Sequence, residues 1–363
     1  MRSVMKVVLA LSLALSPAAL AGEEKEFSEV EYYKNLAEKQ LAEAQLNDKT
    51  ESYAPESHAA ETYATEYYEE CIEEKPANAF VVIPQYFHAR NDKAKFKVGG
   101  NRLEMAKGRA NGAGTTVLYN RTVTDWFSFA LMYEYGFLNV TSGVPVARGS
   151  GVYNRESSRW HSHVVGFLPE FNFGDFGRLQ LSVIQGFDRA SGSETVGNDR
   201  RDIDDYGTDV TSLMAWYQKD FQLGCSNWKL TPYAGWRSLY VKVKDANDWN
   251  AAPGTLRDDN TWVHLASGGF KLSYQQGAFG FNVRGGVSHR TSKDDVPGYG
   301  NRAVAPGVVH FSHRANLDKT VGTAGAAVTY AINRRAIVSA GYDGYYGKDT
   351  SSHMGSLSFI FPF

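Results

Sequence analysis

Hydrophobic and polar residues alternate with a period of two along most of the chain from about residue 79 onward. Because successive side chains of a β-strand point to opposite faces, this alternation predicts strands with one apolar face. The last residues show it clearly, since Leu357, Phe359, Phe361 and Phe363 alternate with smaller or polar neighbours. Such a stripe would aggregate in water, whereas a barrel strand in a membrane points it to lipid. The pattern therefore predicts an outer-membrane β-barrel whose last strand faces lipid.

Twelve such strands can be placed, which gives an all-β, antiparallel transmembrane β-barrel. The strands are expected at about 79–90, 111–121, 125–139, 158–172, 177–190, 208–221, 227–243, 260–275, 278–291, 320–332, 335–347 and 352–363. Long polar connections are expected at 91–110, 140–157, 191–207, 244–259 and 292–319, with short turns between them. Since long loops face outside and tight turns face the periplasm, both barrel ends are expected on the periplasmic side. A further hairpin near Val308 to Phe311 would make fourteen strands, which is the alternative.

The alternation also assigns side chains to the two faces of the barrel. On the strand at 125–139, Phe129 and Tyr133 fall on the lipid face and Glu134 falls on the inner face. The residues expected to line the pore are Glu134, Lys229, Tyr233, Arg237, Asn282, Arg284 and Arg290. Pro232 lacks a backbone N–H, so we expect a β-bulge at this position.

The first 78 residues do not follow the strand pattern. Arg2 and Lys6 precede an apolar run that ends in Ala-Leu-Ala, which is typical of a secretory signal peptide at 1–21. Residues from Glu24 to Leu46 are mostly helix formers. Their narrow apolar stripe consists of Val30, Ala37, Leu41 and Ala44. We therefore expect an acidic helical and linker segment at 22–78, followed by the barrel at 79–363.

Charge separates this segment from the barrel. Residues 23–75 contain 16 acidic and 5 basic residues, a net charge of −11, whereas residues 76–363 carry a net charge of +7. An acidic segment beside inner-face cations would be drawn into the lumen as a plug; a solvated tail is the other interpretation. The basic residues are spread over strands and loops, so nucleic acid is not an expected partner. After the signal peptide, no run of about 18 apolar residues exists, which excludes a helical membrane protein.

Several segments together resemble the β-barrel translocator domain of autotransporters. The first strand reads AFVVIPQYFHAR, and NGAGTTVLYNRTVTDWFSFALMYEYG follows as a glycine-led strand, a turn and an aromatic strand. In WKLTPYAGWRSLYVKV, residues 230–235 and Arg237 fit that family's L-T-P-Y-A-G-x-R strand, and the chain ends in SLSFIFPF. The resemblance covers about 79–363, and it is carried by the ordered series rather than by any single piece.

This resemblance implies a twelve-stranded barrel with a helix in the lumen that tethers an exported passenger. Here only residues 22–78 lie between signal peptide and barrel, so a large passenger is not expected. The leading hypothesis is an autotransporter-type barrel whose short N-terminal segment threads or plugs the pore. The segment would then be either a plug or a minimal passenger. The alternative is an outer-membrane porin, a diffusion channel whose inner Arg and Lys residues favour anions.

Three further groups of residues, namely two cysteines, two histidines and several aspartates, could carry a disulfide, a metal site or catalysis. Cys71 and Cys225 are both expected on the periplasmic side, where a disulfide could join them; two separate thiols are the alternative. His161 and His163 share a strand face without nearby acidic or cysteine ligands, so interfacial packing is expected rather than metal binding. The acidic residues expected in loops are Asp202, Asp204, Asp205, Asp294 and Asp295. We interpret them as solvated charges, and we expect no enzymatic activity, metal or cofactor.

The expected location and partners follow from export and from the resemblance. A signal peptide and a lipid-facing barrel place the protein in the outer membrane of a Gram-negative-type bacterium. The expected partners are outer-membrane lipid and lipopolysaccharide, periplasmic chaperones, and the barrel-assembly machinery, which would engage the C-terminal strand.

Overall fold

A computed structural model describes the barrel region of the chain. It covers residues 78–91, 95–98, 101–104, 108–145, 153–196, 199–224, 226–244, 259–292, 296–304, 307–315, 318–333, 335–348 and 350–363. The predicted signal peptide, the acidic helical segment up to residue 77, Cys71 and Cys225 lie outside the described residues.

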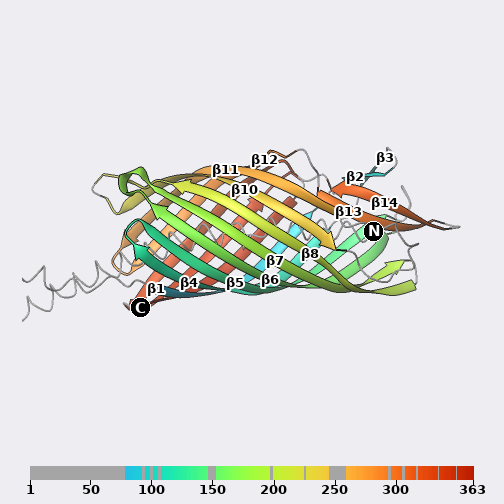
Figure 1. Ribbon diagram of the computed structural model, residues 1–363, viewed down its shortest axis with the longest axis horizontal. Helices are drawn as coiled ribbons and strands as arrows, with labels where there is room; N and C mark the ends of the chain where they lie inside the picture. The colour runs from blue at the N-terminus through green and yellow to red at the C-terminus, as the bar shows by residue number, and fades with distance from the viewer. Residues whose placement is uncertain are drawn as a thin grey trace, which may run out of the picture.

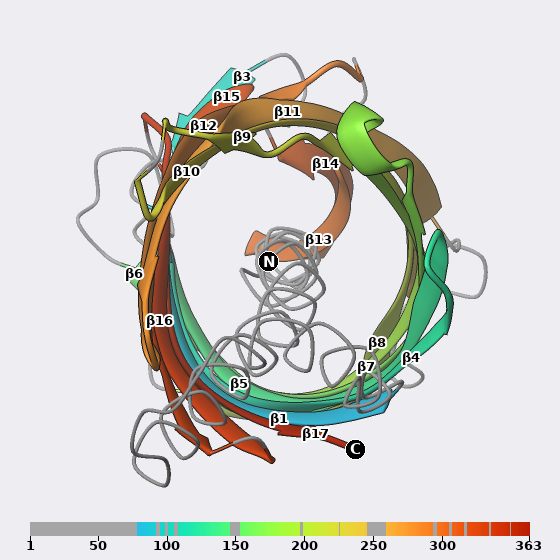
Figure 2. The same ribbon diagram turned by 90° about the vertical axis from the view of Figure 1, so that its left-hand side faces the viewer.

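Twelve long antiparallel strands form a closed barrel (Figures 1 and 2). They are β1 (Asn78–Asn91), β4 (Gly108–Thr124), β5 (Phe127–Pro145), β6 (Tyr153–Asn172), β7 (Arg178–Val196), β8 (Asp199–Gln218), β10 (Trp228–Lys244), β11 (Asp259–Gln276), β12 (Phe279–Arg290), β15 (Thr320–Asn333), β16 (Ala336–Tyr346) and β17 (Thr350–Pro362). Neighbours in the chain pair throughout, and β1 pairs with β17 to close the ring. A two-residue strand, β9 (Phe221–Gln222), continues the edge of β8 beside β10. The predicted number of barrel strands is confirmed.

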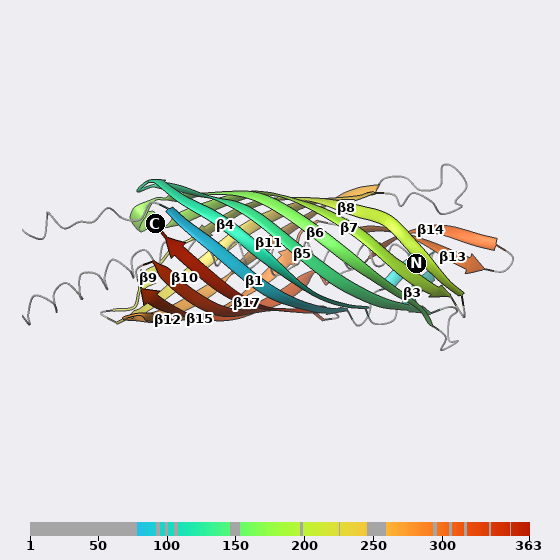
Figure 3. The ribbon, with the colours of Figure 1, turned by 90° about the horizontal axis from the view of Figure 1, so that it is seen from below.

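The first and last strands meet at one end of the barrel, which is called the terminal end below. Asn78 N–H donates to Phe363 O at 3.1 Å, and Phe363 N–H donates to Asn78 O at 2.9 Å. Figure 3 shows β1 and β17 side by side, with the C-terminus at this end. Pairing continues from Ala79 with Pro362 to Asn91 with Thr350. The barrel thus has no open edge strand, which satisfies the main requirement for a sheet in lipid.

The strands extend further than the hydrophobic pattern predicts. β5 and β6 remain paired as far as Pro145 with Tyr153, and β7 and β8 as far as Val196 with Asp199. The predicted long loops at 140–157 and 191–207 are therefore wrong over most of their length. Most of their residues are polar or glycine, so they carry no sustained apolar alternation, although backbone hydrogen bonds continue the ladder.

Two hairpins lie outside the barrel sheet. β13 (Val296–Val304) pairs with β14 (Gly307–Ala315), and β2 (Lys95–Val98) pairs with β3 (Asn101–Glu104). The predicted hairpin in the 292–319 connection exists, but it forms a separate two-stranded sheet, so a fourteen-stranded barrel is wrong. Figure 1 places β13 and β14 at the mouth opposite the C-terminus, and Figure 2 places them within the outline of the ring.

Pro232 does not produce the predicted bulge. β10 pairs without a register shift with β11, and its pairings with β8 and β9 keep one register on the other side. Lys219 N–H donates to Pro232 O at 3.3 Å, so the ring nitrogen of Pro232 faces the same neighbour. The missing N–H therefore interrupts regular pairing only at Lys219 and Asp220, where β8 ends and β9 has not begun.

The outer surface is apolar and aromatic. Large exposed side chains alternate with buried ones along the strands, for example Leu131 at 49% and Tyr133 at 46% exposure. Near the terminal end, aromatic rings pack against each other, as in Trp126 with Phe171 and Trp228 with Phe281. Within the described ranges, no helix has the length and hydropathy that a membrane span requires.

Candidate functional site: the inner face of the barrel

The buried side chains of each strand lie on the face opposite the exposed apolar stripe. On β5, Ala130, Met132 and Glu134 are buried at 1%, 7% and 9% exposure, between exposed Leu131, Tyr133 and Tyr135. In a closed barrel these two faces are the inside and the outside. The inner face is therefore the surface that any molecule in the lumen would contact.

The residues predicted to line the pore all fall on this inner face by the same alternation, but they do not form one group. Tyr233, Arg237, Arg290 and Glu134 are buried, at 9%, 3%, 4% and 9% exposure. Lys229, Asn282 and Arg284 are partly exposed. Lys229 lies near the terminal end, Tyr233 and Arg284 line a shared cavity, and Glu134 lies on β5.

At the terminal end, Asp220 gathers two cations on the inner rim. Its Oδ2 is 3.0 Å from Arg178 Nη2 and 2.9 Å from Lys229 Nζ, and Thr231 Oγ1 donates to Oδ1 at 2.6 Å. Burial alone would raise the pKa of this carboxyl, but Arg178 and Lys229 outweigh it and lower the pKa to about 2. Asp220 therefore stays ionised and fixes both cations at the mouth.

Deeper in the barrel, Arg284 of β12 pairs with Asp343 of β16 across β15. Arg284 Nε donates to Asp343 Oδ1 at 3.0 Å, and its Nη2 donates to the same oxygen. The side chain of Asp343 is 4% exposed and that of Arg284 is 11% exposed. Because both groups have left bulk water, each depends on the other for charge compensation.

Tyr233 and Trp216 lie against the inner wall beside this ion pair. Their rings stack at 5.0 Å between centroids, and Tyr233 Oη donates to Gly285 O at 3.3 Å. In the strand register, Tyr233 lies opposite Gly269 of β11, and Gly269 lies opposite Gly286 of β12. The tyrosine ring therefore lies over a strip of backbone that carries no side chains. A Cβ on Gly286 would lie 2.5 Å from Tyr233 Oη. The glycines are thus required where the tyrosine crosses them.

A small cavity opens between these groups. Its volume is about 30 Å³, enough for a water molecule, and Tyr233, Ser267, Arg284 and Asp343 contribute to its lining. Its walls come from β8, β10, β11, β12, β15 and β16, and they combine these polar groups with apolar side chains such as Trp216 and Val287.

On the opposite wall, a hydrogen-bonded chain crosses three strands. Gln85 Nε2 of β1 donates to Thr116 Oγ1 of β4 at 3.3 Å, and Thr116 Oγ1 donates to Glu134 Oε2 of β5 at 3.0 Å. On the wall that holds the cavity, Arg237 of β10 donates through Nε to Ser212 Oγ of β8 at 2.9 Å. These contacts fix inner polar groups to neighbouring strands.

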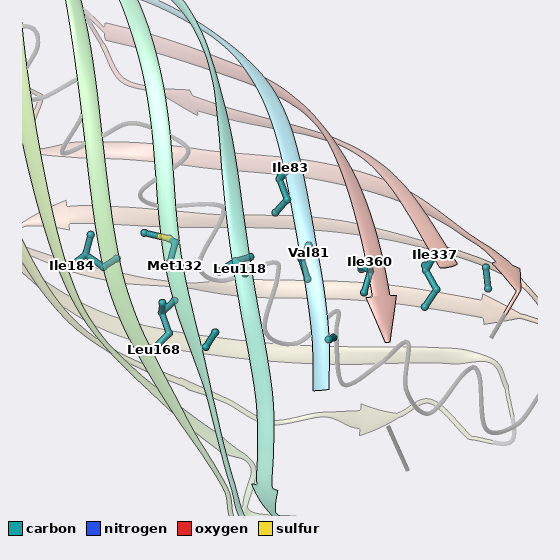
Figure 4. Packing of buried hydrophobic residues seen from close by; sticks show 11 residues of the cluster. Val81, Ile83, Leu118, Met132, Leu168, Ile184, Ile337 and Ile360 are labelled. Atoms are coloured by element: carbon teal, nitrogen blue, oxygen red, sulfur yellow. The ribbon is translucent and has the colours of Figure 1, made fainter. Parts of the chain in front are cut away.

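The inner face also carries an apolar cluster near the terminal end, which the sequence interpretation did not anticipate. Figure 4 shows its side chains on one face of adjacent strands. The cluster consists of Ala79, Val81, Ile83, Leu118, Ala130, Met132, Leu168, Ile184, Ala331, Ile337 and Ile360, all at 7% exposure or less. Val164 and Ala278 pack against it. The lumen thus has an apolar zone near the terminal end and polar zones elsewhere.

The remaining predicted residues lie elsewhere. Leu357, Phe359, Phe361 and Phe363 are 39–63% exposed on the outer face of β17 and its end. His161 and His163 also lie on the outer face, where Tyr135 and Tyr133 hydroxyls hydrogen-bond them at 2.9 Å and 3.0 Å. Asp202, Asp204 and Asp205 belong to β8, so placing them in a loop was wrong.

The structure says less about the predicted loop residues Asp294 and Asp295 and about metal binding. Asp294 and Asp295 lie outside the described residues. The described part of the chain holds no group of three His, Cys, Asp or Glu side chains that could bind a metal ion.

Comparison with known proteins identifies this barrel. The family model for the autotransporter beta-domain matches residues 90–343. The chain belongs to the autotransporter β-domain family. This family implies a transport unit in the outer membrane of Gram-negative bacteria, as the sequence predicted.

Solved structures agree with this family on the fold of the barrel. The translocator domain of the autotransporter NalP from Neisseria meningitidis is 14% identical, covers 84% of this chain and 95% of its own, and superposes with a TM-score of 0.59. The transport unit of the autotransporter AIDA-I from Escherichia coli is 13% identical, with 83% and 97% coverage and a TM-score of 0.54. A search of curated protein sequences finds no match.

Proposed function

We propose that this autotransporter β-domain holds its own N-terminal segment, residues 22–77, inside the lumen as a plug or minimal passenger. The observation that carries the proposal is the apolar cluster on the inner face. It includes Ala79, Val81 and Ile83, the inward residues at the start of β1, so the chain that precedes Asn78 begins beside it. A segment that enters the mouth at this point would meet the apolar zone first.

The composition of the segment matches both zones of the inner face. Its apolar stripe of Val30, Ala37, Leu41 and Ala44 would pack on the apolar cluster. Its net charge of −11 would be attracted by inner-face cations such as Arg237 and Arg290. Desolvating an apolar stripe against an apolar wall stabilises the inserted state by roughly 25 cal/mol per Å² of apolar surface buried.

Single-channel conductance in planar bilayers tests this proposal. The full-length protein would be compared with a variant lacking residues 22–75, both refolded into the same lipid. We expect the full-length protein to be closed for most of the recording and the deletion variant to give a large, steady conductance. Equal conductance with anion preference in both proteins would show that the segment lies outside the lumen and that the barrel acts as a porin.

A variant inside the lumen gives a sharper test, because it keeps the segment intact. Met132→Glu places a charge within the apolar cluster, whereas Leu131→Glu places it on the outer face of the same strand. If the segment packs on the cluster, Met132→Glu raises the open probability of the full-length protein and has no such effect on the deletion variant. The outer-face change serves as the control and leaves the gating of a correctly folded barrel unchanged.

The two cysteines report on the position of the segment. We propose that Cys71 and Cys225 form a disulfide that holds the segment at the terminal end in the oxidising periplasm. Full-length protein should then show a mobility difference on denaturing gels between oxidised and reduced samples, and Cys225→Ser should remove it. Two free thiols in protein isolated from membranes would contradict the disulfide, although not the plug.

A further inference from the structure

Basic side chains form a line across the outer face of the barrel from β1 to β10, one membrane thickness away from the terminal end. The line, which we name the outer cationic belt, consists of Arg90 (β1), Arg109 (β4), Arg159 (β6), Arg189 (β7) and Lys242 (β10). Each lies 11 to 15 residues along its strand from the strand end nearest the terminal end. A transmembrane β-strand needs about 9–11 residues to cross the hydrocarbon core. The belt therefore lies just beyond the lipid tails, at the level of the headgroups.

The belt faces outward rather than into the lumen. Arg109, Arg159 and Arg189 are exposed, and their neighbours in the chain Ala110, Trp160 and Asp188 are buried on the inner face. The strand register places Arg90 opposite Arg109, and it places Arg189 opposite His161, which lies two residues along β6 from Arg159. Like charges that face each other across a strand pair are unfavourable in water. An anion bound beside Arg90 and Arg109 would interact favourably with both.

Histidines fixed by aromatic and polar groups border the belt. Tyr135 Oη lies 2.9 Å from His161 Nδ1, and Tyr342 Oη lies 2.6 Å from His353 Nδ1. His88 stacks on His353 at 6.3 Å between ring centroids. All the barrel-strand histidines with described side chains lie on this outer face, namely His88, His161, His163, His264, His289 and His353. Imidazole can donate hydrogen bonds to phosphate oxygens.

Acidic residues are scarce at this level. Among the described side chains of β1 to β10, Asp209 is the acidic residue that faces outward, and it lies opposite Lys242 in the register. At the terminal end, by contrast, exposed Arg121 and exposed Asp125 are close in sequence. The positive charge is therefore concentrated at the level of one leaflet.

We propose that the outer cationic belt binds the phosphate groups of phosphorylated glycolipids in the outer leaflet, the lipid A part of lipopolysaccharide. Guanidinium groups bind phosphate through paired hydrogen bonds, which are stronger than neutral ones. Lipid is the source of the phosphate because the belt adjoins the apolar outer surface on which acyl chains lie. This proposal depends on the position of the barrel in the membrane and not on the plug in the lumen. The lipid-binding proposal and the proposed function can therefore fail independently.

The test measures thermal stabilisation of the full chain in detergent micelles by lipid. The probes are bisphosphorylated lipid A, the same lipid with both phosphates removed, and inorganic phosphate. The variant is Arg109→Gln/Arg159→Gln/Arg189→Gln, and Arg121→Gln, an exposed arginine at the terminal end, is the matched control. Heat-modifiable mobility on gels shows which samples are folded. Arg159→Gln alone is measured in parallel, so that the proposal stays testable if the loss of three charges prevents the triple variant from folding.

We expect bisphosphorylated lipid A to raise the unfolding temperature of the native protein and of Arg121→Gln. The triple variant should require at least about tenfold more lipid for the same rise, and Arg159→Gln should show a smaller loss in the same direction. Equal stabilisation of native and triple-variant protein would overturn the proposal, and so would an equal effect of the dephosphorylated lipid. An equal effect of inorganic phosphate would show a site for free anions and would overturn the assignment to lipid.

Discussion

The glycine strip beneath Tyr233 gives a prediction that two neighbouring residues can test. Gly286 and Gly285 are adjacent on β12 and face opposite sides of the barrel wall. A Cβ on Gly286 would lie 2.5 Å from Tyr233 Oη and 2.7 Å from Gly268 O. A Cβ on Gly285 would meet only Thr323 O, at 3.9 Å. The two alanine substitutions are therefore chemically identical but differ in the space that they find.

The difference in the free energy of unfolding follows from this geometry. Inserting a methyl group into filled space costs about 1–3 kcal/mol. Replacing glycine by alanine in an open strand position instead gains roughly 0.5 kcal/mol, because the unfolded chain loses conformational freedom. Gly286→Ala should therefore be less stable than Gly285→Ala by about 2 kcal/mol.

Equilibrium unfolding in lipid vesicles, followed by tryptophan fluorescence, measures this difference. Gly286→Ala should also weaken the near-ultraviolet circular dichroism of the Trp216 and Tyr233 pair, since the tyrosine ring must move. Tyr233→Phe removes the closer of the two clashing oxygens, so Gly286→Ala should cost less in that background. Equal stability of the Gly286→Ala and Gly285→Ala proteins would refute the proposed role of the glycine strip.

Three further predictions concern charges and the lipid face. The pKa of Asp220 is lowered to about 2, so its ion pairs stabilise the barrel above about pH 4, and this contribution of about 1 kcal/mol is lost as the pH falls toward 2. Asp220→Asn should remove that part of the pH dependence in acid unfolding curves, and an unchanged curve would contradict it. Arg284→Leu alone should cost about 3–5 kcal/mol because it leaves Asp343 buried without its cation. Adding Asp343→Leu should restore part of that stability in the same unfolding assay, and additive losses would contradict the coupling. Leu131→Arg should lower the free energy of unfolding in vesicles by about 2–4 kcal/mol, since it places a charge among lipid tails. An unchanged free energy of unfolding would contradict the placement of Leu131 within the hydrocarbon core.

Sequence periodicity identified the barrel strands because each of them must separate a lipid face from an inner face. On β5 the alternation of Leu131 with Met132 is dictated by that boundary, and the strand was therefore found. Beyond the membrane the boundary ends, and the strand continuation from Ser191 to Val196 has no apolar face to reveal it. Hairpin pairing there is carried by backbone groups, which every sequence possesses.

The contacts between inner-face side chains could not be predicted from sequence periodicity. Alternation placed Tyr233, Arg284 and Glu134 on the inner face, but it contains no information on which inner side chains contact each other along the wall. Asp343 was missed because its partner Arg284 lies two strands away in the barrel. Asp220 was missed because it lies in the break opposite Pro232, where the strand pattern stops. Glycines at facing positions on neighbouring strands, such as Gly269 and Gly286, are the signal that could have located Tyr233 against the wall.

The two surfaces of this barrel place charge in opposite ways, and the difference has a physical reason. Inside, Arg284 is compensated by Asp343 on a nearby strand, and Asp220 compensates Arg178 and Lys229, so these inner charges are balanced within the wall. Outside, the belt residues include Arg109, which lies opposite Arg90 and Thr141 in the register. The apolar zone of the inner wall can bind the N-terminal segment, whereas the basic residues of the outer belt can bind anions of the membrane. Replacing bisphosphorylated lipid A by the dephosphorylated lipid should therefore destabilise the barrel without opening the pore. Removing residues 22–75 should open the pore in the presence of either form of lipid A.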